Sequence, residues 1–174
     1  GEGFKIVAGE KVEKAKSLFP ARKGNYQFPT LELLQEPEAR PPSQVENHEE
    51  TAVALKNTLA EFGVKVELGE VHTGPVITRY EVYPAPGVRV EKIANLAKNL
   101  GMSLKAQSVR ILAPVPGKGC VGVEVPNDER ETVYLKEIIA DERFADARSK
   151  LTVALGKDIE GFPVVADLAK MPHL

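Results

Sequence analysis

The residues of this chain that could do chemistry are mainly cations on one stretch. Between Lys92 and Val123 there are basic side chains and no acidic one, although the net charge of the chain is −2: Lys92, Lys98, Lys105, Arg110 and Lys118. Acidic residues gather earlier, at Glu46, Glu49 and Glu50. The simpler interpretation is two solvated faces of opposite sign. The alternative is that the basic stretch faces phosphates or an acidic neighbouring subunit.

Residues 117–122 resemble a nucleotide-binding motif. GKGCVG matches G-x-G-x-x-G, but those glycines must leave a strand and open a helix. Here the following residues alternate like a strand and end at Pro126, so we predict a hairpin. Neither Gly-Lys pair is followed by Ser or Thr, so the sequence has no phosphate-binding loop of the Walker A type. We expect no cofactor in this chain.

Hydrolytic and metal chemistry have no convincing pattern. The serines lack a G-x-S-x-G elbow, and the single cysteine, Cys120, cannot form an internal disulfide. His48, His72 and His173 stand without Cys or His at metal-ligand spacing, so we expect neither a catalytic residue nor a metal site. Arg79, inside an alternating segment, could contact a phosphate or a neighbouring subunit, but pairing with a cross-strand acid is favoured.

The elements that would position these side chains follow from hydrophobic periodicity. Residues 45–62 predict a helix with Ala52, Leu55, Leu59 and Phe62 on one face, ended by Gly63. Two alternating segments follow, and the order helix, strand, strand then recurs. The predicted strands are 64–71, 76–83, 109–115 and 120–125, and the second helix is 90–105.

Two helix–strand–strand units predict an α+β fold. We expect a four-stranded, largely antiparallel sheet with helices on one side. A third helix is predicted over 130–140, burying Val133, Ile138 and Ile139. A C-terminal β-hairpin is predicted from strands at 151–155 and 163–166 around the turn 156–161. Residues 1–42, with five prolines between 20 and 42, predict a linker or extended strap, in which 10–19 could form a short helix.

Bulk composition agrees with a globular domain. The chain is 43% apolar and 28% charged, and no stretch approaches the ~20 apolar residues of a membrane helix. We therefore expect no membrane contact from this part of the protein.

Several runs resemble the FtsK/SpoIIIE family of bacterial DNA translocases, in the family's order from about residue 26 to 174. They are 74–81 (GPVITRYE), 85–88 (APGV), 122–127 (GVEVPN), 131–135 (ETVYL), 155–158 (LGKD) and 163–174 (PVVADLAKMPHL). In that family a segment similar to the last run leads into the Walker A strand. The resemblance implies that 1–42 is the linker, 43–150 the α domain and 151–174 the start of the RecA-like β domain.

The resemblance also implies a function. The family's parent proteins have a membrane-anchored N-terminal part, and their hexameric motor on the cytoplasmic side of the bacterial inner membrane encircles double-stranded DNA. The β domain binds ATP and Mg²⁺, hydrolyses ATP and moves DNA in chromosome segregation coupled to cell division. This chain would be a non-catalytic, ring-forming part that packs on its own β domain. Lys92, Lys98, Lys105, Arg110 and Lys118 then become candidates for contact with DNA.

Two other function classes compete with this interpretation. A stand-alone interaction or RNA-binding module would share the α+β fold, but the chain has no Trp, four Tyr and six Phe, without the interleaved aromatic pattern of an RNA-binding sheet. A small-molecule enzyme would need the glycine motif that the hairpin prediction removes. Division, sporulation and conjugation roles stay open.

Overall fold

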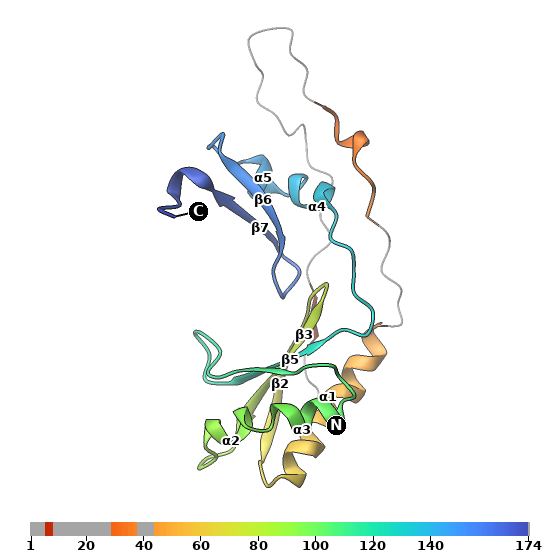
Figure 1. The fold of residues 1–174 in the computed structure, drawn as a ribbon, viewed down its shortest axis with the longest axis vertical. Helices are drawn as coiled ribbons and strands as arrows, with labels where there is room; N and C mark the ends of the chain where they lie inside the picture. Colours follow the sequence, from red (N-terminus) through yellow and green to blue (C-terminus); the bar gives the residue numbers. More distant parts are fainter. Residues whose placement is uncertain (1–5, 9–28, 38–43, 174) are drawn as a thin grey trace.

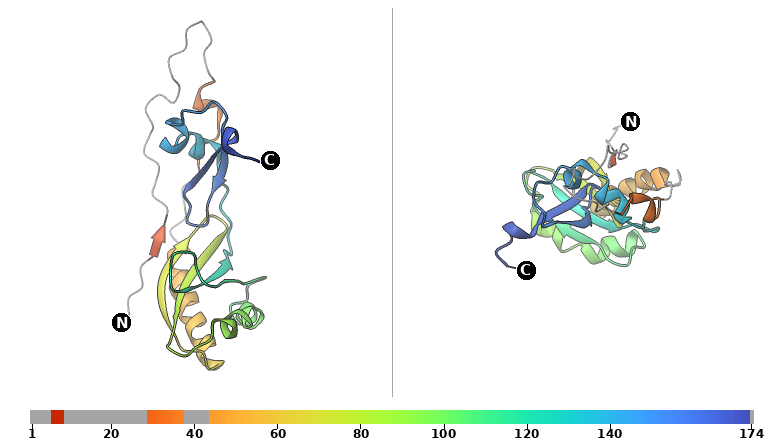
Figure 2. Two further views of the ribbon diagram at one scale, coloured as in Figure 1. Left: turned by 90° about the vertical axis from the view of Figure 1, so that its left-hand side faces the viewer. Right: turned by 90° about the horizontal axis from the view of Figure 1, so that it is seen from above.

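The structure, a computed structural model, describes residues 6–8, 29–37 and 44–173. Two parts follow each other along the long axis (Figure 1). The first, here the sheet unit, holds a mixed sheet with α1 to α3. The second, here the hairpin unit, holds a two-stranded sheet with α4 and α5. A quarter turn shows the same arrangement, with the hairpin turn directed at the sheet unit (Figure 2).

The sheet of the sheet unit has the strand order β1-β2-β3-β5-β4. Four of these strands are antiparallel, as predicted: β2 (Val66–Thr73), β3 (Ile77–Pro84), β5 (Val121–Pro126) and β4 (Arg110–Leu112). A short strand that the sequence analysis missed, β1 (Ile6–Ala8), joins the outer edge of β2 in parallel. The predicted α+β class, with a four-stranded antiparallel sheet and a separate hairpin, is confirmed.

All three helices of the sheet unit cover one face of the sheet. α1 (Gln44–Glu61) buries Ala52, Leu55 and Leu59 against β2, as its periodicity predicts. Phe62, expected on the same stripe, is 42% exposed because the helix ends at Glu61 and Gly63 turns the chain at φ +68°. The facing sheet residues form the core with the helices: Val66, Val71, Tyr80, Val82, Val121, Val123 and Val125.

The second predicted helix, 90–105, is wrong as a single element. It is divided into α2 (Val90–Ala94) and α3 (Ala97–Ser103). The junction is Asn95, where α2 ends, and Leu96, whose backbone leaves the helical region. Asparagine is a residue type that favours helix ends over helix interiors. Both pieces still bury the predicted face, since Ile93 and Leu100 have no exposed surface.

The hairpin unit contains the predicted hairpin, with β6 (Thr152–Lys157) antiparallel to β7 (Pro163–Asp167). The predicted helix 130–140 is only the five-residue α4 (Leu135–Ile139), because the capping contacts of Tyr134 and Glu137 begin it there. α4 buries Ile138, as predicted, but Val133 precedes the helix. The four-residue α5 (Glu142–Ala145) was not predicted; it contacts both strands, and the short η2 (Leu168–Lys170) follows β7.

Of the predicted linker, 1–42, the described residues include β1 and η1 (Leu31–Leu33). The predicted helix at 10–19 lies outside the described residues, and the domain boundaries at 42 and 150 stay predictions. Among the helices of the described ranges, none has the length and apolar character needed to cross a membrane.

Candidate functional site: a charge cluster on the open face of the sheet

A β-bulge in β2 decides which side chains reach the face of the sheet without helices. Leu68 pairs with Val82, but Val71 pairs with Tyr80, so one extra residue stands in β2 at Gly69 and Glu70. The insertion shifts the alternation: Leu68 and Val71 both face the core, while Glu70 and His72 face the open side. A Cβ at Gly69 would overlap the ring of Tyr83, so any larger residue there would have to displace this partly exposed side chain.

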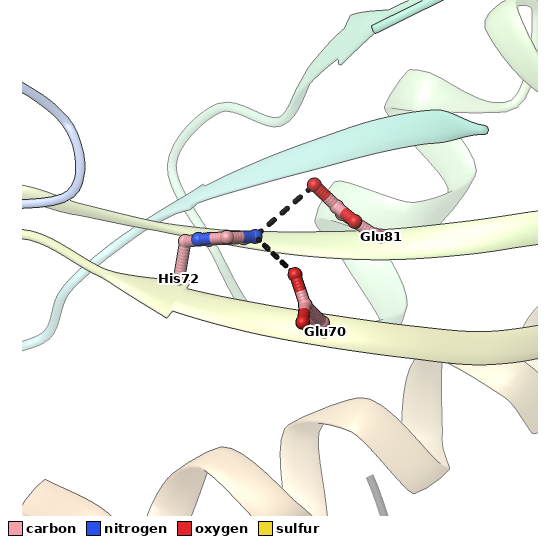
Figure 3. A group of neighbouring side chains, drawn as sticks. All are labelled: Glu70, His72 and Glu81. Carbon is pink, nitrogen blue, oxygen red and sulfur yellow. Dashed lines mark ion pairs between the residues drawn. The ribbon is translucent and has the colours of Figure 1, made fainter. Parts of the chain in front are cut away.

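Glu70 and His72 meet Glu81 of the adjacent strand β3 (Figure 3). The His72 Nε2 atom lies 3.1 Å from Glu81 Oε1 and 3.5 Å from Glu70 Oε2. His72 is 4% exposed and Glu81 is 1% exposed. A buried carboxylate is stable only when paired, so this position needs a cation.

Lys118 provides that cation from the turn before β5. Its ammonium donates to both carboxylate oxygens of Glu81, at 2.8 and 3.0 Å, and to Glu70 Oε2 at 3.1 Å. The hydrogen bond to Glu81 is the main cause that raises the pKa of Lys118 above its ordinary value. The Lys118 side chain, a DNA-contact candidate from the sequence, is thus engaged in ion pairs within the chain, although 37% of it is exposed.

Glu70, His72 and Glu81 also have the donor atoms of a divalent-metal site, all within 4.8 Å of one another. The sequence analysis missed this group because its members come from two strands and the bulge aligns them. The Lys118 ammonium lies 3.5 Å or less from an atom of each, however, so a positive charge already stands at their centre. In this arrangement the Lys118 ammonium neutralises the carboxylates of the group.

Arg79 extends the cluster toward the hairpin unit. Its Nη2 donates to Glu160 Oε1 at 2.6 Å, and Glu160 comes from the turn between β6 and β7. The prediction that Arg79 pairs with a cross-strand acid is wrong in its partner: the residue opposite it on β5 is Glu124, but the acid that Arg79 binds is Glu160 of the β6–β7 turn. We refer to Glu70, His72, Arg79, Glu81, Lys118 and Glu160 as the charge cluster.

Of the remaining DNA-contact candidates, Lys92, Lys98 and Lys105 lie on the helical side of the sheet unit. Arg110 pairs in register with Glu124, the register partner of Arg79, and so lies on the open face. Lys92 Nζ donates to the Gly63 carbonyl oxygen at 3.2 Å, and Arg110 Nη1 lies 3.6 Å from Glu124 Oε2. Lys98 and Lys105 are exposed, and neither has a hydrogen-bond or ion-pair partner among the described residues. The five candidates therefore do not form one site.

Lys98 and Lys105 line a single open groove of about 500 Å³ along α3. Its other walls include Met102, Gln107 and Ser108, and no acidic residue lines it. Two unpaired ammonium groups beside neutral hydrogen-bonding side chains are suited to an extended anion such as a phosphate backbone.

The glycine motif at 117–122 is a hairpin, as predicted. Gly117 has φ +76°, the Val115 amide donates to the Cys120 carbonyl oxygen at 2.9 Å, and β5 starts at Val121. No helix follows these glycines, so the arrangement that binds a pyrophosphate is not formed.

A second cavity, of about 320 Å³, lies between α1 and the end of β5. At its wall His48 Nδ1 is 3.2 Å from the Tyr80 hydroxyl. Burial raises the pKa of Tyr80 to about 12, an effect that a hydrogen bond to Thr51 opposes. Burial also lowers the pKa of His48 below its ordinary value of 6.5.

We expect acid to destabilise the protein through His48. Because the pKa of His48 is lower in the folded state, the unfolded state binds more protons as pH falls through 6.5, and stability is lost in that window. An NMR titration of the His48 ring should give a pKa below 6.5, and urea unfolding of His48→Gln should lose part of the pH dependence between pH 7 and pH 5. A His48 pKa at or above 6.5 would contradict this assignment.

Comparisons with known proteins identify the family. The family model of the FtsK alpha domain matches residues 28–127, and the FtsK/SpoIIIE family model matches residues 134–174. DNA translocase FtsK 1 of Neisseria meningitidis is 51% identical over 159 residues, covering 89% of this chain and 19% of the relative. DNA translocase FtsK 2 of Ralstonia nicotianae is 46% identical over 174 residues, covering 97% of this chain and 22% of the relative.

DNA translocase FtsK of Caldanaerobacter subterraneus is 43% identical over 168 residues, covering 97% of this chain and 24% of the relative. The chain thus spans about a fifth to a quarter of the length of these curated relatives. Because the alpha-domain model alone matches more than half of the residues, the chain belongs to the FtsK/SpoIIIE family.

Proposed function

We propose that this chain is a non-catalytic, ring-forming part of an ATP-driven double-stranded DNA translocase that acts in chromosome segregation coupled to cell division. The observation that carries the proposal is the succession of two matches in one chain, the FtsK alpha domain followed by the FtsK/SpoIIIE model. The relatives are named DNA translocases, which supports a duplex as the partner.

In this proposal the parent protein supplies the chemistry. Its β domain binds ATP and Mg²⁺, it assembles as a hexamer around the duplex, and it is anchored to the inner membrane of a bacterium with this chain on the cytoplasmic side. The sheet unit serves as a collar that guides DNA and couples to the ATPase. The charge cluster supports a mechanical role, because its ions bind one another and so connect β2, β3, the turn before β5 and the β6–β7 turn.

A collar on moving DNA needs weak contacts that do not depend on base sequence, and phosphate contacts have this property. Lys98 and Lys105 suit the role best among the five candidates. Neither of them has an ion-pair partner among residues 6–8, 29–37 and 44–173, whereas the ammonium of Lys118 is engaged with Glu81 and Glu70.

Replacing Lys98 and Lys105 together by glutamine should weaken DNA binding equally on unrelated sequences. The dependence of log affinity on log salt should flatten by about one for each phosphate contact removed. Fluorescence anisotropy of the parent translocase with two duplexes, from 50 to 200 mM salt, measures this.

The matched control is Lys150→Gln, which removes one positive charge at an exposed position in the hairpin unit, outside the groove. The control should keep the wild-type slope. An unchanged slope in the double variant would reject the Lys98 and Lys105 contacts. The chain alone should hydrolyse no ATP with or without DNA, and turnover of any nucleotide by the purified chain would favour an enzyme instead.

A further inference from the structure

The turn between β6 and β7 contacts the sheet unit, and three features of this contact and of the turn itself bear on how firmly the two are joined. Ile159 and Glu160 of this turn approach the open face of the sheet beside the turn that joins β2 to β3. Both ribbon views place the hairpin turn at this end of the sheet (Figures 1 and 2).

The first feature is the Arg79–Glu160 ion pair. The Arg79 side chain is 10% exposed and the Glu160 side chain is 30% exposed, so water screens the 2.6 Å contact only partly. His72 Nδ1 lies 3.5 Å from the same Glu160 oxygen, without hydrogen-bond geometry. Arg79 Nε and His72 Nδ1 are buried polar atoms that already have no hydrogen-bond partner among the described residues. Displacing Glu160 would also remove the acceptor of Arg79 Nη2, in a corner that is already short of acceptors.

The second feature is the close approach of two backbones at Gly74. A Cβ atom on Gly74 would overlap the carbonyl group of Ile159. The β2–β3 turn cannot move aside easily, because the Gly74 amide donates to the Ile77 carbonyl oxygen at 3.0 Å and Asn127 Nδ2 donates to the Gly74 carbonyl oxygen at 2.8 Å. Only glycine permits the hairpin turn to lie at this distance.

The third feature is the internal rigidity of the approaching turn. Asp158 Oδ1 accepts hydrogen bonds from the Glu160 and Phe162 amides, both at 2.9 Å. The Asp158 amide donates to the Phe162 carbonyl oxygen at 2.9 Å, which closes the turn. The β6–β7 turn and the β2–β3 turn that it contacts are therefore both held by internal hydrogen bonds.

We infer that Arg79, His72 and Gly74 form a docking site for the turn at residues 158–162, and that this joint makes the sheet unit and the hairpin unit move as one body. The partner that the site fits is a closed acidic turn of the same chain. The joint continues into the sheet, since Glu81 lies 3.9 Å from Arg79 and binds Lys118. The inference deepens the proposed function, on which its mechanical meaning rests, because a collar that follows an ATPase needs a stiff connection.

The joint can be tested on the chain itself, without DNA or ATP. Spin labels at Lys65→Cys in the sheet unit and Leu155→Cys in the hairpin unit, both exposed positions, report the distance between the units in a Cys120→Ala background. We expect one narrow distance distribution for the docked chain. Glu160→Ala should raise the undocked population by about 10-fold or more, because a charge-assisted hydrogen bond contributes on that scale. Gly74→Ala should also raise it, because the added Cβ overlaps the carbonyl group of Ile159 in the docked position.

Two controls separate docking from general damage. Lys157→Met removes the 2.8 Å ion pair with Glu137, which lies within the hairpin unit, and Gly119→Ala adds a methyl group where nothing lies within 4 Å. Both should keep the narrow distribution. Glu160 is in a partly exposed turn, so its variant remains informative even if Gly74→Ala fails to fold.

An unchanged distribution in Glu160→Ala, or a broad distribution in the docked parent chain, would overturn the joint. Neither result bears on DNA contact, since the measurement contains no DNA. Conversely, an unchanged salt slope at Lys98 and Lys105 would leave the joint intact. Failure of the joint and failure of the proposed function are therefore distinguishable.

Discussion

Lys118→Met should lower the free energy of unfolding by about 2–3 kcal/mol. The substitution leaves the Glu81 carboxylate, whose side chain is 0% exposed, without the ammonium that donates to both of its oxygens. Breaking a buried ion pair on one side costs about 3–5 kcal/mol. The effect here is placed lower because the Lys118 side chain is 37% exposed, so water screens the pair. Urea denaturation with matched m-values measures the change.

The double variant Lys118→Met/Glu81→Gln gives the decisive control. Removing the buried negative charge together with its partner should restore at least half of the lost stability, because the cost comes from the unpaired carboxylate and not from the missing lysine. Lys98→Met makes the same chemical change at an exposed lysine without a partner among the described residues and should stay within about 0.5 kcal/mol of the parent. A loss in Lys118→Met no larger than in Lys98→Met would refute the role of the cluster.

Leu100→Ala should lower the free energy of unfolding by about 3 kcal/mol, within the range of about 2–5 kcal/mol for truncating a buried leucine. Leu100 has no exposed surface and is part of the hydrophobic core that joins α3 to the sheet. Thermal or urea unfolding measures the loss. Because α3 also lines the groove of Lys98 and Lys105, we expect weaker DNA contact as a secondary effect.

Met102→Ala is the matched control on the same helix. Its side chain is 82% exposed, so truncation should change stability by less than about 0.5 kcal/mol. Equal losses of stability in Leu100→Ala and Met102→Ala would mean that burial of one face of α3 does not stabilise its packing on the sheet.

Local pattern predicted the elements whose side chains alternate between core and solvent. The stripe of Ala52, Leu55 and Leu59 placed α1 within one residue of its observed bounds, and Gly63 marked its end. The same approach failed at Asn95 and Leu96, because an apolar stripe continues across a break that only the backbone angles show. β1 was missed since a three-residue strand has too short a pattern to detect.

The candidate site was less predictable than the fold. The basic residues from Lys92 to Lys118 follow one another in the sequence without an acidic residue between them. In the structure, however, Lys118 lies on the open face of the sheet and Lys98 lies on the helical side. The partner of Arg79 lies 81 residues away, a separation that no sequence pattern encodes. A glycine in the interior of a predicted strand, Gly69, was the available signal of a bulge and hence of the cluster.

The bulge at Gly69 and Glu70 has a consequence for how related chains are compared. Before the bulge, the even-numbered residues of β2 face the core, and after it the odd-numbered residues do. The number of residues in the strand therefore decides which side chains are buried. An alignment that slides this strand by one position would equate Val71 with Glu70 or His72 and exchange interior with exterior along half the strand. Gaps are therefore correctly placed outside residues 66–73, and relatives that appear to need one within that segment differ in architecture there.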